Sequence, residues 1–474
     1  MDGEEKKPAA DMKKMVAVAA IGAGVEFGWA IQLSLLTPYV QQLGVPHKWA
    51  PLFWFAGPFA GMVVQPILGF FSDRSSSRFG RRRPFLAAYV SVVSLAAFLM
   101  AFAADLGHRR HNSRAVTISI FGIGDLLLEC GNIAIYTHCA AFLGDLTAGN
   151  PKRARTASSL FSFFMAVGGV LGYAAGLYTH LYKIFPFALT DSCDIYCANL
   201  KSCLILAITI LVATSVFTLW YVPDKATNTT TATTDGARKL GIWREMKEVK
   251  RPMWMLLMVT FMNWAAWFPF MLYNTDWMGR EIYGGDDNGG GDHSKKVYDA
   301  GVRMGALGLM LNAVVQGITS LGAEWMGRKM GGANRLWGAA NFGLGVCLGM
   351  TALVTRQPAL TQRTTGALLL FALLGFPMAV TFCVPFAMAA ILSTEHGVGQ
   401  AFTMGLVNFA ILMPQMVISV GAGPFDEAFG GGNLPAFVGG AILALISAVM
   451  AFFLLPSSSS SSSSPPPSDT ASTA

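Results

Sequence analysis

Two carboxylates, Asp125 and Glu129, lie four residues apart in an apolar stretch from Ala115 to Leu143 that contains no Lys or Arg. The stretch is long enough to cross a bilayer as one helix. On a helix these two acids share a face, and Asn132 and Tyr136 extend the same stripe. An acid inside a bilayer is costly unless it is paired, protonated or facing a water-filled cavity, so it usually marks a functional site. The alternative is a carboxyl that is only hydrogen-bonded in a packed bundle, but two acids, an amide and a phenol on one stripe favour a lined cavity.

The composition places this stripe in a polytopic membrane protein. The chain has 474 residues, of which 53% are hydrophobic and 13% are charged, against about 25% charged in a typical soluble domain. The net charge of +7 does not indicate a nucleic-acid partner, because the basic residues fall in loops between apolar spans. No spacing typical of a metal, phosphate or nucleophile site stands out. We therefore expect no enzyme activity, no metal and no cofactor.

Twelve apolar segments must position the acids, as judged with a window of about 19 residues. The predicted segments are Met15 to Leu43, Ala50 to Ser72, Pro84 to Asp105, Ala115 to Leu143, Thr156 to Leu181, Cys203 to Val222, Pro252 to Tyr273, Ala300 to Ala323, Leu336 to Thr355, Gly366 to Leu392, Ala401 to Ala422 and Leu434 to Leu455. The sequence thus predicts an all-α membrane protein with twelve transmembrane helices.

The longest polar interruption, residues 223–251, divides the chain into two sets of six segments. We predict a tail at 1–14, a first six-helix bundle at 15–222, a linker at 223–251, a second bundle at 252–455 and a disordered Ser- and Pro-rich tail at 456–474. Most Lys and Arg residues lie in the first tail and after even-numbered segments, which favours cytoplasmic termini. Cys193, Cys197 and Cys203 cluster in a predicted outward loop, where one disulfide can form.

The stretch from Gly69 to Pro84 reads GFFSDRSSSRFGRRRP, an acid within a basic loop between two segments. It resembles the loop signature of the major facilitator superfamily, which implies that fold of two six-helix bundles. In that family the loop helps to close the cytoplasmic gate, a role that the resemblance assigns to Asp73, Arg74, Arg81 and Arg82. The alternative is a basic loop that only sets topology.

The resemblance extends to the plant sucrose/proton symporters over nearly the whole chain, in order. The matching stretches are Phe27 to Tyr39, Pro46 to Ala50, Gly69 to Pro84, Phe161 to Gly168, Asn263 to Phe270, Thr275 to Glu281, Gly305 to Asn312 and Gly430 to Phe437. Among them, Pro-His-Lys-Trp and Asp-Trp-Met-Gly-Arg-Glu are too distinctive for chance similarity between apolar helices.

The resemblance implies a proton-coupling acid in the fourth segment, and there this chain departs from the family pattern. Glu129 stands where the family carries an aspartate, Asn132 matches one of two asparagines, and Ala140 replaces an arginine that would hold the acid ionised. His138 either substitutes for that cation or simply packs. Glu26 stands where the family usually has glutamine, so we expect Glu26, Asp125 and Glu129 to share one cavity and titrate as a coupled cluster.

Other residues have side chains suited to sugar recognition or gating. The tryptophans Trp29 and Trp264 can stack on sugar rings, the amides Gln32, Asn132 and Asn263 can bind hydroxyls, and His47 matches a family histidine near the sugar path. For each of these a structural role is the alternative. Asp276, Arg280 and Glu281 match the family at the end of the seventh segment, where they form either a gate or a helix-end salt bridge.

The resemblance implies import of sucrose or a related glucoside by proton symport through alternating access. In this hypothesis Glu129 exchanges the proton and also contacts the sugar. Uncoupled sugar facilitation and a transporter-like sugar sensor are the alternatives. We expect a monomer in the lipid bilayer whose partners are sugar and protons, with no nucleic acid; the plasma membrane is the expected location and the vacuolar membrane the alternative.

Overall fold

The long apolar segments form α-helices, because a helix satisfies all its backbone hydrogen bonds within one segment and so tolerates a solvent of lipid. The computed structural model describes residues 6–64, 67, 80, 82–108, 113–147, 151–178, 180–223, 249–286, 291–396 and 400–455. The elements of the first half are α1 (Lys6–Gln42), η1 (His47–Phe55), α2 (Ala56–Phe59), η2 (Ala60–Val64), α4 (Arg83–Ala101), α5 (Ala103–His108), α6 (Ser113–Thr147), α7 (Pro151–Leu177), α8 (Leu181–Ile184), η3 (Pro186–Ala188) and α9 (Ile195–Tyr221).

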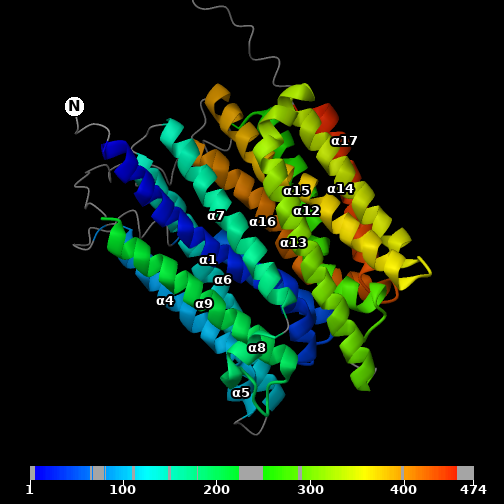
Figure 1. Ribbon diagram of the computed structural model, residues 1–474. Coiled ribbons are helices and arrows are strands. Elements are labelled where there is room, and N and C mark those ends of the chain that lie inside the picture. The colour runs from blue at the N-terminus through cyan, green and yellow to red at the C-terminus, as the bar shows by residue number, and fades with distance from the viewer. Residues whose placement is uncertain are drawn as a thin grey trace, which may run out of the picture.

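The second half contains α12 (Arg251–Trp277), η4 (Met278–Ile282), α13 (Gly291–Lys329), α14 (Ala333–Thr355), α15 (Leu360–His396), α16 (Gln400–Ala428) and α17 (Leu434–Leu454). Figure 1 shows the blue to green helices of the first half beside the green to red helices of the second half. Within the described residues, 11 helices are long and apolar enough to cross a membrane. The predicted second segment, Ala50 to Ser72, is described only through η1, α2, η2 and one further residue.

Small residues set the packing within the first half. A Cβ atom added at Gly168, Gly172 or Gly176 of α7 would lie 2.2 Å from the Ala23 oxygen, 2.6 Å from the Ala30 Cβ and 2.9 Å from the Ser34 Oγ, respectively. These three glycines, four residues apart, therefore let α1 and α7 approach backbone to backbone. The contact fixes which face of α1 is left to meet α6.

Several helices are longer than the predicted apolar segments. The eighth segment was predicted from Ala300 to Ala323, whereas α13 spans Gly291–Lys329. Likewise α16 continues to Ala428, beyond the predicted end at Ala422. A hydropathy window detects only the apolar part of a helix, so polar turns at the ends are missed.

One disulfide joins Cys193, which precedes α9, to Cys197 in the first turn of that helix, with a Cα–Cα distance of 5.2 Å. Cys203, the third member of the predicted cluster, is a buried free thiol. The tail predicted at 1–14 is not wholly outside the helices, because α1 already begins at Lys6. The linker at 223–251 lies largely, and the tail at 456–474 wholly, outside the described residues.

Candidate functional site

The two acids of α6 face α1, and each meets a polar side chain there. The indole N–H of Trp29 donates to Glu129 Oε1 at 3.2 Å, and the Gln32 amide donates to Asp125 Oδ1 at 3.5 Å. Trp29 and Gln32 are one turn apart on α1, and the two acids are one turn apart on α6. Where the two helices pack together, each α1 side chain therefore lies opposite one acid. Asp125 is 2% exposed.

Asn132 continues the stripe below Glu129 and is buried, with an amide nitrogen that has no hydrogen-bond partner among the described residues. Gly28 of α1 lies opposite, because a Cβ there would be 4.0 Å from that nitrogen. The next member of the stripe, Tyr136, is 38% exposed. Tyr136 lies toward the end of the bundle where α1 begins, which we call the termini end.

Glu26 lies on α1 one turn before Trp29. Its side chain packs on Gly169 of α7, where an added Cβ would lie 3.5 Å from Glu26 Cγ. The structure thus joins Asp125 and Glu129 on α6 and places the third predicted acid against α7. Within the described part of the chain, none of the three carboxylates forms an ion pair with Lys, Arg or His.

His138 does not lie on the acid stripe. It follows Glu129 by nine residues, which is half a turn out of phase on a helix. Its ring packs against Phe85 and Tyr89 of α4, with centroid distances of 5.9 and 4.7 Å. Its position is therefore that of a packing histidine, and it does not supply the cation that is missing at Ala140.

Asn263 and Trp264 lie inside the second half and do not meet the acids. Asn263 is fully buried and donates to Asn341 Oδ1 of α14 at 2.5 Å, and Asn341 in turn donates to Ser447 of α17 at 2.8 Å. Trp264 is 6% exposed and packs edge to face on Phe382. In this arrangement both side chains hold helices of the second half together.

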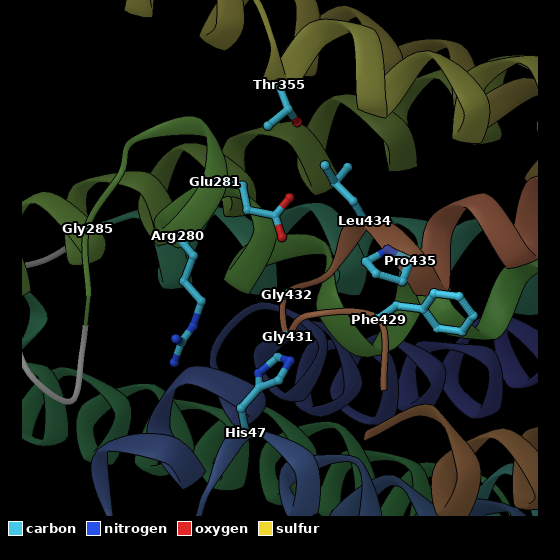
Figure 2. Close-up of a pocket in the computed structure, with 10 residues that line it drawn as sticks. All are labelled: His47, Arg280, Glu281, Gly285, Thr355, Phe429, Gly431, Gly432, Leu434 and Pro435. Atoms are coloured by element: carbon cyan, nitrogen blue, oxygen red, sulfur yellow. The ribbon is translucent and has the colours of Figure 1, made fainter. Parts of the chain in front are cut away.

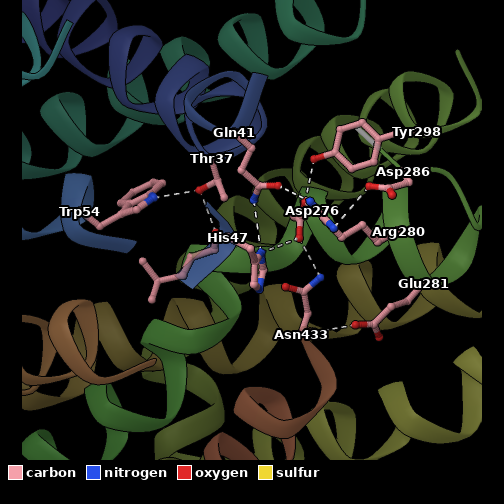
Figure 3. A network of polar contacts seen from close by, with 11 residues as sticks. Thr37, Gln41, His47, Trp54, Asp276, Arg280, Glu281, Asp286, Tyr298 and Asn433 are labelled. Carbon is pink, nitrogen blue, oxygen red and sulfur yellow. Dashed lines mark hydrogen bonds and ion pairs between the residues drawn. The ribbon is translucent and has the colours of Figure 1, made fainter. Parts of the chain in front are cut away.

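A second polar cluster joins the two halves at the opposite end of the bundle, which we call the network end (Figure 3). At its centre Asp276, fully buried on α12, accepts hydrogen bonds from Arg280 Nε at 3.0 Å, Tyr298 at 2.7 Å and Asn433 at 3.0 Å. Arg280 Nη2 also donates to Gln41 of α1 at 2.6 Å. Arg280 thereby links the first half to the second.

His47 completes the network from η1. Its Nδ1 lies 3.6 Å from Asp276 Oδ2, and its ring stacks on Tyr273 with a centroid distance of 5.1 Å. Burial lowers the pKa of His47 below its usual value; Asp276 opposes this effect and Arg280 adds to it. The geometry thus favours a neutral imidazole beside an Asp276 carboxylate that is already satisfied by Arg280.

Further contacts between the halves lie at this same end. Thr37 donates to the Leu272 carbonyl at 2.9 Å, and Lys48 pairs with Glu427 at 3.3 Å. In addition, Lys295 of α13 pairs with Asp194, the N-cap of α9, at 2.7 Å. These contacts close the two halves against each other at the network end.

Glu281 points away from Asp276 and accepts from the Asn433 backbone N–H at 2.5 Å. Together with His47 and Arg280 it lines a cavity of about 750 Å³ beside the loop that carries Gly431 and Gly432 (Figure 2). This cavity flanks the network rather than the acid stripe.

The structure describes one of the four residues predicted for the cytoplasmic gate. Arg82 is buried just before α4. Asp73, Arg74 and Arg81 lie outside the described residues, so their gating role stays a prediction.

Sequence reasoning did not single out Gln41, Tyr298 and Asn433 as partners of the network. Asn433 falls in one of the stretches that matched the family, which was a usable signal. Gln41 and Tyr298 carry no such signal, because only the approach of α1 and α13 to α12 gives them a role.

Comparisons with known proteins agree with this architecture. Residues 15–289 match the family described as MFS/sugar transport protein. The chain is 43% identical to sucrose transport protein SUT2 of Oryza sativa subsp. japonica, covering 93% of this chain and 92% of that protein. It is 41% identical to sucrose transport protein SUC4 of Arabidopsis thaliana, covering 92% of this chain and 89% of that protein.

Solved structures show the same fold. A crystal structure of a D-xylose-proton symporter aligns with a TM-score of 0.65 at 14% identity, covering 94% of this chain and 98% of that chain. The inward open conformation of the xylose transporter XylE from E. coli aligns with a TM-score of 0.60 at 14% identity, covering 94% and 97%. The predicted fold and the predicted family are both confirmed: this chain is a multi-pass membrane transporter, not an enzyme, and it belongs to the plant sucrose/proton symporter family within the major facilitator superfamily.

Proposed function

We propose that this transporter carries sucrose or a related glucoside together with protons, and that Glu129 is the carboxyl that exchanges the coupling proton. The contact between Trp29 and Glu129 carries the proposal, because it sets an aromatic face and a hydrogen-bond donor beside a membrane-embedded acid. A sugar ring can stack on Trp29 while one of its hydroxyls binds Glu129. Proton and sugar then bias the same conformational equilibrium.

In this proposal the neighbouring acids Asp125 and Glu26 raise the free energy of a negative charge on Glu129. Like charges in a water-poor cavity cannot all ionise, so loss of one proton is resisted by the others. Gln32 and Asn132 supply amide groups on the two helices that border the stripe. Asn263 and Trp264 stay candidates for sugar binding only if α12 rearranges in the transport cycle.

The structure corresponds, in this proposal, to a state that is closed at the network end and open at the termini end. The contacts of Asp276 and Arg280 at one end and the exposure of Tyr136 toward the other support it. The termini end would face the cytoplasm of a monomer in the plasma membrane. Asp276, Arg280 and Glu281 then form the outer gate, while Asp73, Arg74, Arg81 and Arg82 contribute to the inner gate.

Glu129→Gln tests the coupling. Sucrose is applied to voltage-clamped cells at external pH of about 5.5 and about 7.5, with labelled uptake in parallel, a range chosen so that proton supply changes about a hundredfold. We expect inward current that grows at the lower pH in the parent protein. Glu129→Gln should abolish accumulation against a gradient while leaving equilibrative flux, and Asp191→Asn, in an exposed loop, controls for loss of an acid.

Uptake without current in the parent protein would refute electrogenic proton symport and would favour facilitation or electroneutral exchange. Accumulation that survives in Glu129→Gln would assign the coupling proton to another group. Absence of both uptake and current would refute the proposed substrate.

A further inference from the structure

Asp426 is a buried acid at the network end that the network does not use. It lies in the last turn of α16 and is fully buried. Neither of its carboxyl oxygens has a hydrogen-bond partner among the described residues. It faces the hydroxyl of Tyr273 on α12 and the backbone N–H of Ala436 in α17 without reaching hydrogen-bond geometry. The Tyr273 hydroxyl is itself without a partner in the described part of the chain.

The nearby cations are already engaged with other acids. On α12 and η4, Arg280 is held by Asp276 at 3.0 Å and lies 3.7 Å from Asp286. On η1, Lys48 pairs with the neighbouring Glu427 on the surface. The imidazole of His47 lies against Asp276 instead.

Two further features oppose a negative charge on Asp426. The negative end of the helix dipole lies in the last turn of α16. The carboxylate of Glu281 is also close enough to repel it. A buried carboxylate that has no cation, no formed hydrogen bond and an unfavourable dipole is far less stable than the neutral acid.

We propose that Asp426 is a second proton-binding site, which holds a proton while the network end is closed and releases it when that end opens. In the closed state a proton on the carboxyl lets Asp426 act as both donor and acceptor toward Tyr273 and Ala436. When α12 and α16 separate from η1, water reaches the carboxyl and stabilises its charge. Closing the network end therefore takes up one proton from the side that this end faces. The inference rests on the proposed gating function of the network, not on the role of Glu129.

The test measures opening of the network end with a cysteine reporter. Leu33 of α1 is partly buried against the second half and lies one turn before Thr37, whose hydroxyl bonds the Leu272 carbonyl. In intact cells, Leu33→Cys should be labelled by a membrane-impermeant thiol reagent only while the network end is open. Phe187→Cys, in the exposed η3 segment, reports the sidedness and corrects for the pH dependence of the thiol.

The decisive quantity is the labelling rate of the parent reporter divided by that of the reporter carrying Asp426→Asn. The amide mimics the neutral acid, and effects of His47 and other groups cancel in the ratio. We expect a ratio near one at about pH 5 that rises at least about threefold by about pH 8, the limit being about tenfold per pH unit for one proton. Glu427→Gln removes the adjacent exposed acid, so its ratio should be independent of pH.

A ratio for Asp426→Asn that is flat with pH would overturn the proposal, and so would the same slope for Glu427→Gln. If Asp426→Asn does not fold, Asp426→Ser removes the titratable group with a smaller side chain and gives the same reading. If Phe187→Cys is labelled only in inside-out vesicles, the proposed orientation is wrong, and the ratio is then read in those vesicles. Loss of proton-driven uptake in Glu129→Gln bears on the proposed function and leaves this ratio unaffected.

Discussion

Gly57 of α2 leaves the space that the Glu129 carboxylate occupies. A Cβ atom at residue 57 would lie 2.9 Å from Glu129 Oε2 and 3.6 Å from its Cδ. Ordinary contacts between heavy atoms are about 3.5 Å or longer, so Gly57→Ala must push the carboxylate by about half an ångström. Because the clash involves only the flexible end of a side chain, we expect Gly57→Ala to fold and to reach the membrane.

The displacement should be felt at Trp29. Both carboxylate oxygens move together, and the Trp29 to Glu129 hydrogen bond of 3.2 Å has little length to spare. Weakening this bond to a charged acceptor costs about 1–2 kcal/mol, which corresponds to an initial rate of proton-driven sucrose uptake that is about 5- to 30-fold lower. The rate is measured at low sugar concentration and normalised to protein at the cell surface.

A second substitution distinguishes this steric explanation from a general effect on α2. Glu129→Asp shortens the acid by one methylene and withdraws it from residue 57, so Gly57→Ala should cost little in the Glu129→Asp background. Gly28→Ala, whose added Cβ would lie 4.0 Å from the Asn132 amide, is the matched control and should be tolerated. An equal loss from Gly57→Ala in both backgrounds would refute the reasoning.

Two other predictions concern the network and the packing of α1. Burial lowers the pKa of His47 below its ordinary value of 6.5, so the closed network binds fewer protons than the open one and loses stability as pH falls through 6.5. Labelling of Leu33→Cys in the Asp426→Asn background should therefore rise on acidification. A labelling profile that His47→Gln leaves unchanged would contradict this. Gly168→Ala places a Cβ 2.2 Å from the Ala23 oxygen and should cost about 1–3 kcal/mol of stability. The nearest atom to a Cβ at Gly169 is Glu26 Cγ, at an ordinary contact distance of 3.5 Å, so Gly169→Ala is the matched control. Equal thermal stability of the two variants in detergent would show that the close approach of α1 and α7 is not limiting.

The contact between α1 and α6 could not be predicted from the sequence, although each helix could. Helical periodicity placed Asp125 and Glu129 on one face, and the structure agrees. Which face of α1 meets them depends on the glycines of α7, whose effect is a matter of three-dimensional packing. Trp29 and Gln32 were therefore predicted as polar or aromatic candidates, but their acid partners were not.

Asn263 shows why a buried amide is ambiguous in sequence. An amide in a membrane span can bind a polar solute or tie two helices together. The structure gives Asn263 a partner, Asn341, that is 78 residues away, and no local pattern encodes that contact. Asp426 was missed for a different reason, since it lies beyond the predicted end of its segment at Ala422 and was thus counted with a loop.

The replacement of the family arginine by Ala140 constrains how Glu129 can work. The donors beside Glu129 in the structure are the neutral indole of Trp29 and the neutral amide of Gln32, and a neutral donor stabilises a carboxylate less than a guanidinium does. An ionised Glu129 therefore depends on water reaching the stripe, which in the proposed mechanism happens from the termini end, where Tyr136 is exposed. When the cavity is closed at both ends, the acid must be neutral or hydrogen-bonded to sugar. Proton release is then tied to opening of the cavity rather than to a fixed cation, which lets one chain keep symport without the arginine.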